Sequence, residues 1–174
     1  MTKTLLLLRH AKSDQTRSPL DDFTRPLNAR GQKAALRMGA YLKEAGLKPD
    51  FVLCSAALRA TETWERALKG LGDKNIKTKK LRSLYLASPG RILDVLKRVP
   101  DEANTVLVIA HNPGMARLAF RLAGKDSKPK ALARMRVKYP TAGLAEIRFA
   151  CKCWADVEVP DAGRLIRFVI PKEL

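Results

Sequence analysis

The stretch Thr4-Leu5-Leu6-Leu7-Leu8-Arg9-His10-Ala11 decides how this chain is interpreted. Its apolar part, residues 4–8, has the length and composition typical of a strand that is buried on both faces of a sheet. A second apolar run, residues 105–110, ends at His111. His10 and His111 are the only histidines among the 174 residues, and each follows a predicted buried strand. Ligands of open α/β sheets bind at the carboxyl ends of strands, so this placement predicts a histidine-based active site.

Strands and helices alternate along most of the chain, and the C-terminal end is rich in strands. The expected strands cover residues 4–8, 51–54, 76–80, 105–110, 144–151 and 165–170, with residues 153–155 as a further candidate. Helices are expected after the capping residues Asn28, Ser55, Ser88 and Asn112, and glycines at 46, 70 and 72 are expected to end the first two. This order predicts an α/β three-layer sandwich, with a mostly parallel central sheet and helices on both faces. The length fits a single domain, residues 1–174.

The chain is strongly basic, with 34 Lys and Arg against 17 Asp and Glu and a formal net charge of +17. The positive residues are densest in two basic runs, 74–82 and 125–138. Such a field attracts anionic partners, although each run alone can be a solvated surface. Nucleic-acid binding is disfavoured because no known binding motif is present and the five Phe and three Tyr form no interleaved stacking pattern.

The three cysteines, Cys54, Cys151 and Cys153, bear on location and metal binding. An odd number without a secretion signal favours free thiols in a reducing compartment, and no apolar run approaches the length of a membrane span. We therefore expect a cytoplasmic protein that does not enter a membrane. Neither a metal nor a cofactor is expected, because Cys151 and Cys153 would need two further ligands and both histidines have better uses.

Three arginines are expected at the same sheet edge as the histidines. Arg9 follows the first strand, Arg59 starts the helix after the second, and Arg25 lies in the loop that returns to this edge. The planar guanidinium group matches phosphate by donating two parallel hydrogen bonds, which indicates a phosphoryl group as the ligand. Taken singly, His111 could be a helix cap or a structural histidine, and Arg59 a surface residue. The joint pattern favours a phosphate site.

Within such a cluster one imidazole can act as a nucleophile. Nearby arginine charges should lower its pKa and keep it neutral, with its lone pair available. Attack on phosphorus would give a phosphohistidine, which water then cleaves, while the arginines and the second histidine stabilise charge on the phosphoryl oxygens. This chemistry requires no metal.

Four motifs together resemble the histidine phosphatase superfamily, also called the phosphoglycerate-mutase-like family. They are Leu8-Arg9-His10-Ala11-Lys12-Ser13, Arg25-Pro26-Leu27-Asn28-x-x-Gly31, Ser55-x-x-x-Arg59-Ala60-x-x-Thr63 and His111-Asn112-Pro113. The short length and the loop at residues 25–27 resemble the SixA branch of small phosphohistidine phosphatases. The resemblance implies that His10 is the phosphorylated nucleophile, that Arg9, Arg59 and His111 bind the phosphate, and that Arg25 is an added cation.

Two departures from the family pattern stand out. Many members have a glycine where this chain has Ala11, and larger members carry an acidic proton donor in a segment that corresponds to residues 79–88, which here contain no Asp or Glu. A phosphorus–nitrogen bond needs such an acid less, because an imidazole leaving group can carry its proton on the far nitrogen. The resemblance therefore favours protein phosphohistidine as the substrate. The remaining candidate donors, each equally a solvated or capping carboxylate, are Asp14, Asp21, Asp22 and Glu62.

Several functions stay open at this point. The expected partner is a phosphorylated protein, such as a histidine phosphotransfer domain, or a small phosphorylated substrate. One alternative is a phosphatase of the same fold that acts on small phosphate esters. The other belongs to a different class: a basic module that binds phosphoproteins or nucleic acid without turnover.

Overall fold

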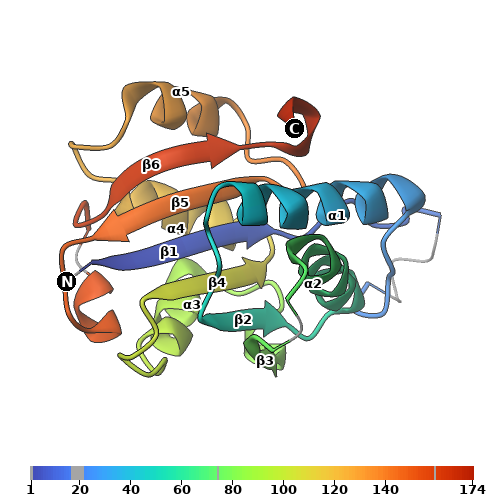
Figure 1. Ribbon diagram of the computed structural model, residues 1–174, viewed down its shortest axis with the longest axis horizontal. Coiled ribbons are helices and arrows are strands. Elements are labelled where there is room, and N and C mark those ends of the chain that lie inside the picture. Colours follow the sequence, from blue (N-terminus) through green and yellow to red (C-terminus); the bar gives the residue numbers. More distant parts are fainter. Residues whose placement is uncertain (1, 17–21, 74, 159) are drawn as a thin grey trace.

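The computed structural model describes residues 2–16, 22–73, 75–158 and 160–174, in which six strands form one sheet (Figure 1). The strands are β1 (Lys3–Arg9), β2 (Phe51–Ser55), β3 (Lys77–Leu81), β4 (Thr105–Ala110), β5 (Leu144–Phe149) and β6 (Arg164–Val169). Their order is β3-β2-β4-β1-β5-β6. The pairs β1–β4, β2–β4 and β2–β3 are parallel, whereas β5 is antiparallel to both β1 and β6. The predicted mostly parallel sheet with a β-rich end is confirmed.

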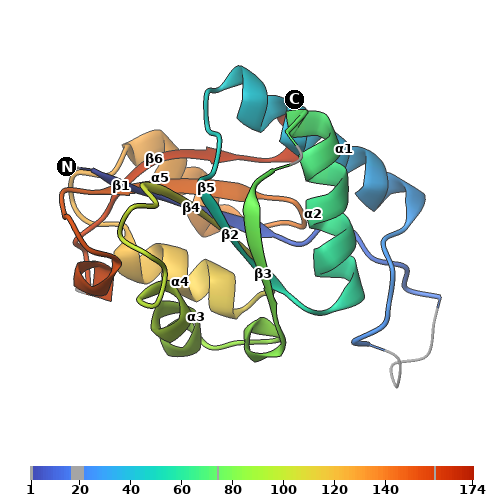
Figure 2. The ribbon, with the colours of Figure 1, turned by 60° about the horizontal axis from the view of Figure 1, so that its bottom comes forward.

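Helices cover both faces of this sheet (Figure 2). They are α1 (Ala29–Glu44), α2 (Leu58–Leu71), α3 (Pro89–Leu96), α4 (Gly114–Leu122) and α5 (Pro129–Val137), with short 3₁₀ turns η2 (Arg82–Leu84), η3 (Trp154–Glu158) and η4 (Pro171–Glu173). Helices α1 and α2 share one buried cluster with the sheet, and α3, α4 and α5 share the other. The three-layer α/β prediction is therefore confirmed. No helix in the described ranges is long and apolar enough to cross a membrane.

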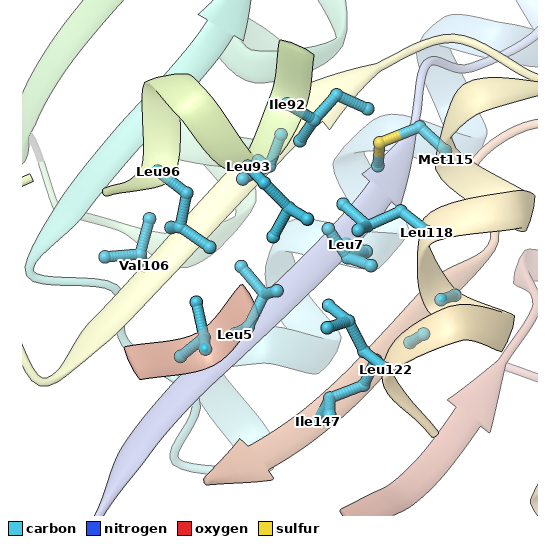
Figure 3. Close-up of a cluster of buried hydrophobic side chains, with 14 of the residues drawn as sticks. Leu5, Leu7, Ile92, Leu93, Leu96, Val106, Met115, Leu118, Leu122 and Ile147 are labelled. Atoms are coloured by element: carbon cyan, nitrogen blue, oxygen red, sulfur yellow. The ribbon is translucent and has the colours of Figure 1, made fainter. Parts of the chain in front are cut away.

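The leucine run of β1 is apolar at consecutive positions because it contributes to both clusters. Leu5 and Leu7 pack against α3 and α4, as Figure 3 shows, while Leu6 and Leu8 lie in the cluster formed with α1 and α2. All four side chains are fully buried. Since truncating a buried leucine costs about 2–5 kcal/mol, this strand is a main source of stability as well as the support of the site.

The predicted helix caps agree with the structure at two of four positions. Asn28 and Ser88 each accept a hydrogen bond from the backbone amide three residues on. Ser55 is not the cap of α2, which has Ala57 at that position without a side-chain cap. The N-cap of α4 is Pro113, so Pro113 precedes the helix instead of lying in its first turn, and Asn112 Oδ1 accepts from Ala116 N at 3.3 Å.

The glycine expectations at the ends of the first two helices are met in part. Gly46, with φ +66°, follows the C-cap of α1, and Gly72, with φ +75°, is the C-cap of α2. Both lie in the left-handed region that favours glycine. Gly70 does not end α2, because it lies inside the helix.

Two further expectations for the second half of the chain were wrong or incomplete. Residues 153–155 are not a strand, because Trp154 begins the turn η3 and is fully buried, with its indole N–H donating to Ala103 O at 2.8 Å. Helix α5 was not anticipated, because its residues were interpreted as part of the basic run at 125–138. Its buried residues Ala131 and Met135 are one turn apart and hold it on the core.

The basic run at 74–82 lies mainly on the edge strand β3, and its first residue, Lys74, is outside the described part of the chain. Lys77, Lys79 and Lys80 are exposed there. Exposed lysines on an edge strand oppose pairing with another chain, so this run has a structural explanation.

Candidate active site

Parallel pairing brings the ends of β1, β4 and β2 to one edge of the sheet. Arg9 is level with Ala110 and Cys54 is level with Ile109, so the residues that follow these positions meet. The rings of His10 and His111 lie 5.0 Å apart between centroids. Both histidines are buried, with exposed fractions of 7% and 1%.

Helix α2 places Arg59 against His10. Arg59 is only 2% exposed, and its Nε lies 3.4 Å from Nε2 of His10. Thr63, one turn further on, accepts a hydrogen bond from Ala11 N at 2.9 Å and donates to Arg59 O at 2.5 Å. This threonine therefore locks the helix to the segment that carries His10. The alternative that Arg59 is a surface residue is wrong.

The hydrogen bonds of His10 assign its tautomer. Nδ1 lies 2.7 Å from Ala11 O, which can only accept, so Nδ1 carries the proton. The lone pair is then on Nε2, which faces the Arg59 guanidinium. Burial, aided by the charges of Arg59, Arg9 and Arg25 and opposed by the Ala11 hydrogen bond, lowers the pKa of His10 to about 3. The ring is neutral at physiological pH, as a nucleophile requires.

His111 is held through its Nε2 atom, whereas His10 is held through Nδ1. Nε2 of His111 lies 2.8 Å from Ser55 Oγ, which also accepts from Ala57 N at 3.3 Å. Ser55 is fully buried, and Nε2 is the one acceptor that its hydroxyl meets among the described contacts, so we assign the serine proton to that hydrogen bond and the ring proton to Nδ1. Nδ1 is buried without a hydrogen-bond partner among the described residues. Burial first, then the neighbouring His10, Arg59 and Arg9, lower the pKa of His111 to about 3, so it is a neutral N–H donor.

Arg9 is oriented by a residue that sequence reasoning missed. Its Nη1 donates to Tyr139 O at 2.9 Å, and Asn112 Nδ2 donates to the same oxygen at 3.0 Å. The Tyr139 hydroxyl is buried and donates to Leu7 O at 2.6 Å. A tyrosine so distant in sequence gives no local signal of this role.

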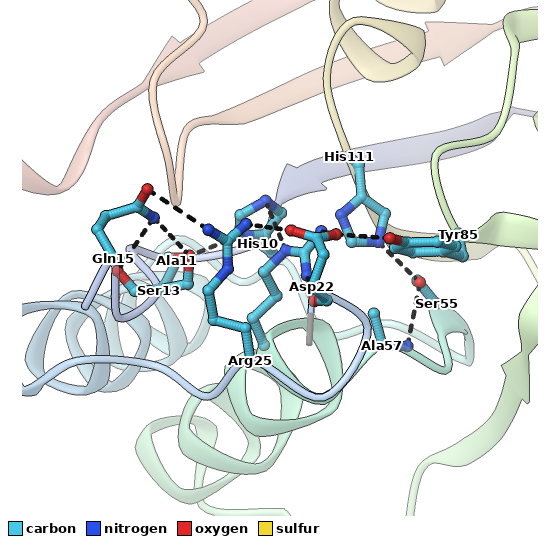
Figure 4. A network of polar contacts seen from close by, with 11 residues as sticks. His10, Ala11, Ser13, Gln15, Asp22, Arg25, Ser55, Ala57, Tyr85 and His111 are labelled. Carbon is cyan, nitrogen blue, oxygen red and sulfur yellow. Dashed lines mark hydrogen bonds and ion pairs between the residues drawn. The ribbon is translucent and has the colours of Figure 1, made fainter. Parts of the chain in front are cut away.

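A further group of polar side chains lies beside Arg59 and His111 (Figure 4): Asp22, Arg25 and Tyr85. Asp22 Oδ1 pairs with Arg25, and Oδ2 contacts Arg59 Nη2 at 3.0 Å and accepts from the Tyr85 hydroxyl at 2.5 Å. The Tyr85 ring meets His111 edge-on, with 5.5 Å between centroids. Sequence reasoning named Asp22 only as a possible donor and gave no role to Tyr85, which lies in the stretch 79–88 that contains no carboxylate.

The protonation state of Asp22 follows from these contacts. Partial burial acts to raise its pKa, but the Tyr85 hydrogen bond and the Arg59 and Arg25 charges lower it overall. Asp22 is thus ionised at neutral pH and is not an acid. The hydrogen bond to Asp22, and then burial, raise the pKa of Tyr85, which keeps its hydroxyl protonated.

The other candidate proton donors stabilise the loop between β1 and α1. Asp14 Oδ1 accepts from Thr16 N at 2.9 Å, and Glu62 Oε2 accepts from Leu27 N at 2.6 Å. Asp21 lies outside the described residues. These contacts agree with the capping role that sequence reasoning left open for Asp14 and Glu62.

All five predicted site residues line one cavity of about 1200 Å³: Arg9, His10, Arg25, Arg59 and His111. Two neutral imidazoles and three guanidinium groups therefore face a common space. Such a set can bind a tetrahedral oxyanion, with Nε2 of His10 supplying a lone pair and Nδ1 of His111 supplying an N–H.

Comparisons with known proteins agree with this arrangement. A model of the histidine phosphatase superfamily (branch 1) matches residues 5–88. An uncharacterized protein of Mycobacterium tuberculosis is 37% identical over 166 residues, which cover 95% of this chain and all of that protein. A structure assigned as the phosphohistidine phosphatase SixA of Nakamurella multipartitia superposes with a TM-score of 0.83 at 27% identity, covering 98% of this chain and 97% of that one. A similarly assigned structure from Agrobacterium tumefaciens gives 0.80 at 25% identity, covering 97% and 98%.

Proposed function

This chain belongs to the histidine phosphatase superfamily, in its SixA-type branch, and from this we propose that it hydrolyses protein phosphohistidine through a covalent intermediate on His10. The observation that carries the proposal is the opposite orientation of the two imidazoles. Nδ1 of His10 is tied to Ala11 O, which leaves the lone pair on Nε2, where Arg59 Nε donates a long hydrogen bond of 3.4 Å. His111 is instead tied through Nε2 and presents Nδ1–H. The cavity thus has one nucleophile and one donor.

The first step forms a bond from His10 Nε2 to phosphorus and breaks the bond from phosphorus to the substrate imidazole. Arg9, Arg25, Arg59 and His111 stabilise the negative charge on the phosphoryl oxygens, so no metal is needed in the proposal. In the second step water attacks phosphorus, the bond to Nε2 breaks, and inorganic phosphate leaves. His10 is then again neutral with its proton on Nδ1.

The absence of a good acid among the described cavity residues supports a phosphorus–nitrogen substrate. Asp22 is ionised, and the Tyr85 hydroxyl that donates to it has a raised pKa. An alkoxide leaving group from an ester needs a proton in the transition state. An imidazole leaving group keeps a proton on its far nitrogen and does not. A cytoplasmic location belongs to the same proposal and is supported by three free thiols.

Turnover of matched substrates tests the proposal. We expect kcat/KM for phosphohistidine to exceed that for an alkyl phosphate such as phosphoserine by about a hundredfold or more, the usual contribution of a general acid. Equal values, or a preference for the ester, would assign the chain to the alternative of a small-ester phosphatase. Tight phosphate binding with no turnover of either substrate would favour the non-catalytic binding module.

Vanadate binding tests the phosphate pocket separately. Arg59→Ala should weaken vanadate affinity by about tenfold or more, because it removes a buried charge-assisted donor from the oxyanion. Unchanged affinity would remove Arg59 from the pocket.

A further inference from the structure

The cavity extends well beyond the residues that handle the phosphoryl group. Its volume of about 1200 Å³ exceeds the range of about 300–1,000 Å³ typical of pockets for whole small ligands. The outer part, here called the outer lobe, is lined by Lys12, Arg30, Ala34, Arg134, Val137, Lys138, Pro171 and Lys172. Figure 1 shows why these residues meet: the C-terminal turn η4 lies between α1 and α5.

The wall of the outer lobe is held together by specific contacts. Arg134 of α5 forms an ion pair with Glu173 of η4, and Arg37 of α1 donates to the Leu174 carbonyl. Three segments from distant parts of the sequence are thereby tied together. A surface fixed in this way is suited to binding a partner without first having to be ordered.

The charge of the cavity lining is almost entirely positive. Asp22 is the single carboxylate among the lining residues that the structure describes, against eight lysines and arginines. Asp22 belongs to the inner site and Glu173 of the wall is paired with Arg134, so the remaining charged side chains of the lobe are cations. Lys12, Arg30, Lys138 and Lys172 are exposed, and Arg134 is half-buried. Two of them, Arg134 and Lys138, belong to the basic run at 125–138, which the inner site does not use. This sign of charge fits an acidic occupant.

The cavity also carries aliphatic surface that a small phosphate ester would not use. Among the large apolar side chains of the described residues, Val137 and Leu86 are the two most exposed, at 87% and 56%. Both line this cavity. Exposed apolar residues beside a charged rim are typical of a contact with another protein.

The aromatic residues of the lining disfavour nucleic acid as the occupant. They are Tyr85, which is engaged with Asp22 and His111, and Phe168, which is 3% exposed and packs on Tyr139 with 4.8 Å between ring centroids. Single-stranded nucleic acids bind by stacking bases on free aromatic rings. Phe168 is buried, and the half-buried ring of Tyr85 already contacts Phe23, His111 and Arg59.

We propose that the outer lobe is a docking surface for an acidic segment of the phosphorylated protein substrate, with the carboxylates facing Arg30, Lys138 and Lys172. An apolar side chain of the same segment contacts Val137. The lobe continues directly into the site of His10, so a segment docked there delivers a neighbouring phosphohistidine to the nucleophile. This inference rests on the proposed function and adds the chemistry of the substrate around the phosphorylated residue.

Two phosphohistidine peptides test the docking surface, one flanked by glutamates and one by glutamines, with free phosphohistidine as the small substrate. For the unmodified protein we expect kcat/KM to be about tenfold or more higher for the glutamate peptide, and this preference should shrink at about 0.5 M NaCl. Equal values for the two peptides would overturn the docking proposal. If free phosphohistidine and both peptides are all left intact, the proposed function itself fails.

Two pairs of charge-reversing substitutions distinguish docking at the outer lobe from attraction by the net positive charge of the whole protein. The pair Lys138→Glu and Lys172→Glu changes the lobe, and the pair Lys77→Glu and Lys79→Glu makes the same change in net charge on β3, whose residues do not line the cavity. The lobe pair should lose the preference for the glutamate peptide and keep turnover of free phosphohistidine within about twofold. The β3 pair should keep the preference. Equal loss in both pairs would show that only the diffuse positive field acts, which contradicts docking at the lobe.

Competition identifies the class of partner. Poly-glutamate should inhibit hydrolysis of the glutamate peptide by the unmodified protein, and a single-stranded oligonucleotide of equal charge should inhibit it less. Inhibition by the oligonucleotide alone would assign the lobe to nucleic acid and overturn the proposal. Inhibition by poly-glutamate that persists in the lobe pair would place the acidic contact elsewhere and would also overturn it.

Discussion

His10 and His111 occupy similar places in the fold and differ in one hydrogen bond. Each follows a buried parallel strand, each is almost fully buried, and burial lowers the pKa of each to about 3. The backbone carbonyl of Ala11 holds Nδ1 of His10, whereas the hydroxyl of Ser55 holds Nε2 of His111. The ring nitrogen left over is an acceptor in the first case and a donor in the second. The hydrogen-bond partner of the other ring nitrogen, and not the electrostatic environment, distinguishes the two roles that we propose.

The two groups that hold the histidine rings come from different parts of the fold, which explains why the two tautomers differ. The carbonyl that holds His10 belongs to the next residue, and Thr63 fixes that segment by accepting from Ala11 N. The hydroxyl that holds His111 comes from the end of β2, a neighbouring strand of the same sheet. One tautomer depends on local backbone and the other on sheet register, so separate variants can change them independently.

Removing His10 should produce the largest effect. His10→Ala deletes the proposed nucleophile, so phosphohistidine turnover and phosphate labelling of the protein should both be lost, a fall of about 10⁴-fold or more. Turnover and acid-labile labelling from a radioactive phosphoramidate measure this.

Vanadate affinity serves as the control for His10→Ala, because the arginines remain and should keep it within about tenfold. Retained labelling in His10→Ala would exchange the roles assigned to the two histidines.

Removing His111 should slow the reaction without preventing covalent chemistry. His111→Ala deletes the N–H that we propose donates to the phosphoryl group, and loss of one such donor lowers kcat by about 10²–10³. Slow labelling on His10 should persist. Labelling that persists while turnover falls would distinguish His111→Ala from His10→Ala, in which both should be lost. A loss in His111→Ala as complete as that in His10→Ala would contradict a donor role for His111.

Acidification should destabilise the protein through both histidines. Their folded-state pKa values of about 3 lie below the unfolded value of about 6.5, so the unfolded chain binds more protons between these limits. Their stabilising contribution is complete above pH 6.5 and is lost as the pH falls toward 3. Between pH 7 and 4.5 the loss is on the order of 2 kcal/mol for each histidine.

Urea unfolding at these two pH values measures this loss. The difference should shrink by a similar amount in His10→Asn and in His111→Asn. An unchanged pH dependence in either variant would mean that burial does not hold that ring neutral.

The sequence predicted the fold, and which residues meet at the cavity, better than it predicted the contacts between them. Apolar runs at 4–8 and 105–110 report strands buried on both faces, and parallel strands bring their ends together, so the meeting of His10 and His111 followed from pattern alone. Hydrogen-bond partners do not follow in this way. Ser55 was interpreted as a helix cap, and only the register of β2 beside β4 shows that it holds His111.

Most structural features that the sequence did not predict depend on contacts between residues far apart in the chain. Tyr139 orients Arg9 from 130 residues away, and Trp154 is buried against Ala103, so neither is visible in local periodicity. In α5 the spacing of Ala131 and Met135 was a usable signal, but the surrounding Lys and Arg concealed it. Asp22 was recognised as a carboxylate near the site, whereas its ionised state depends on Arg59, Arg25 and Tyr85 together.

Ser55→Ala should have the smallest effect and tests the origin of the difference between the histidines. It removes the hydrogen bond to His111 Nε2, so the ring no longer prefers the Nδ1–H tautomer, and kcat should fall by about three- to tenfold, roughly 1 kcal/mol. Nitrogen-15 chemical shifts of His111 should change from one tautomer to a mixture, while those of His10 stay the same. Ser88→Ala is the matched control, since it removes a serine that accepts from a backbone N–H at the start of a helix away from the cavity lining. It should cost about 1 kcal/mol of stability with kcat unchanged. If Ser55→Ala keeps both kcat and the His111 shifts of the unmodified protein, the serine does not set the tautomer, and its hydrogen bond is not the origin of the difference between the two histidines.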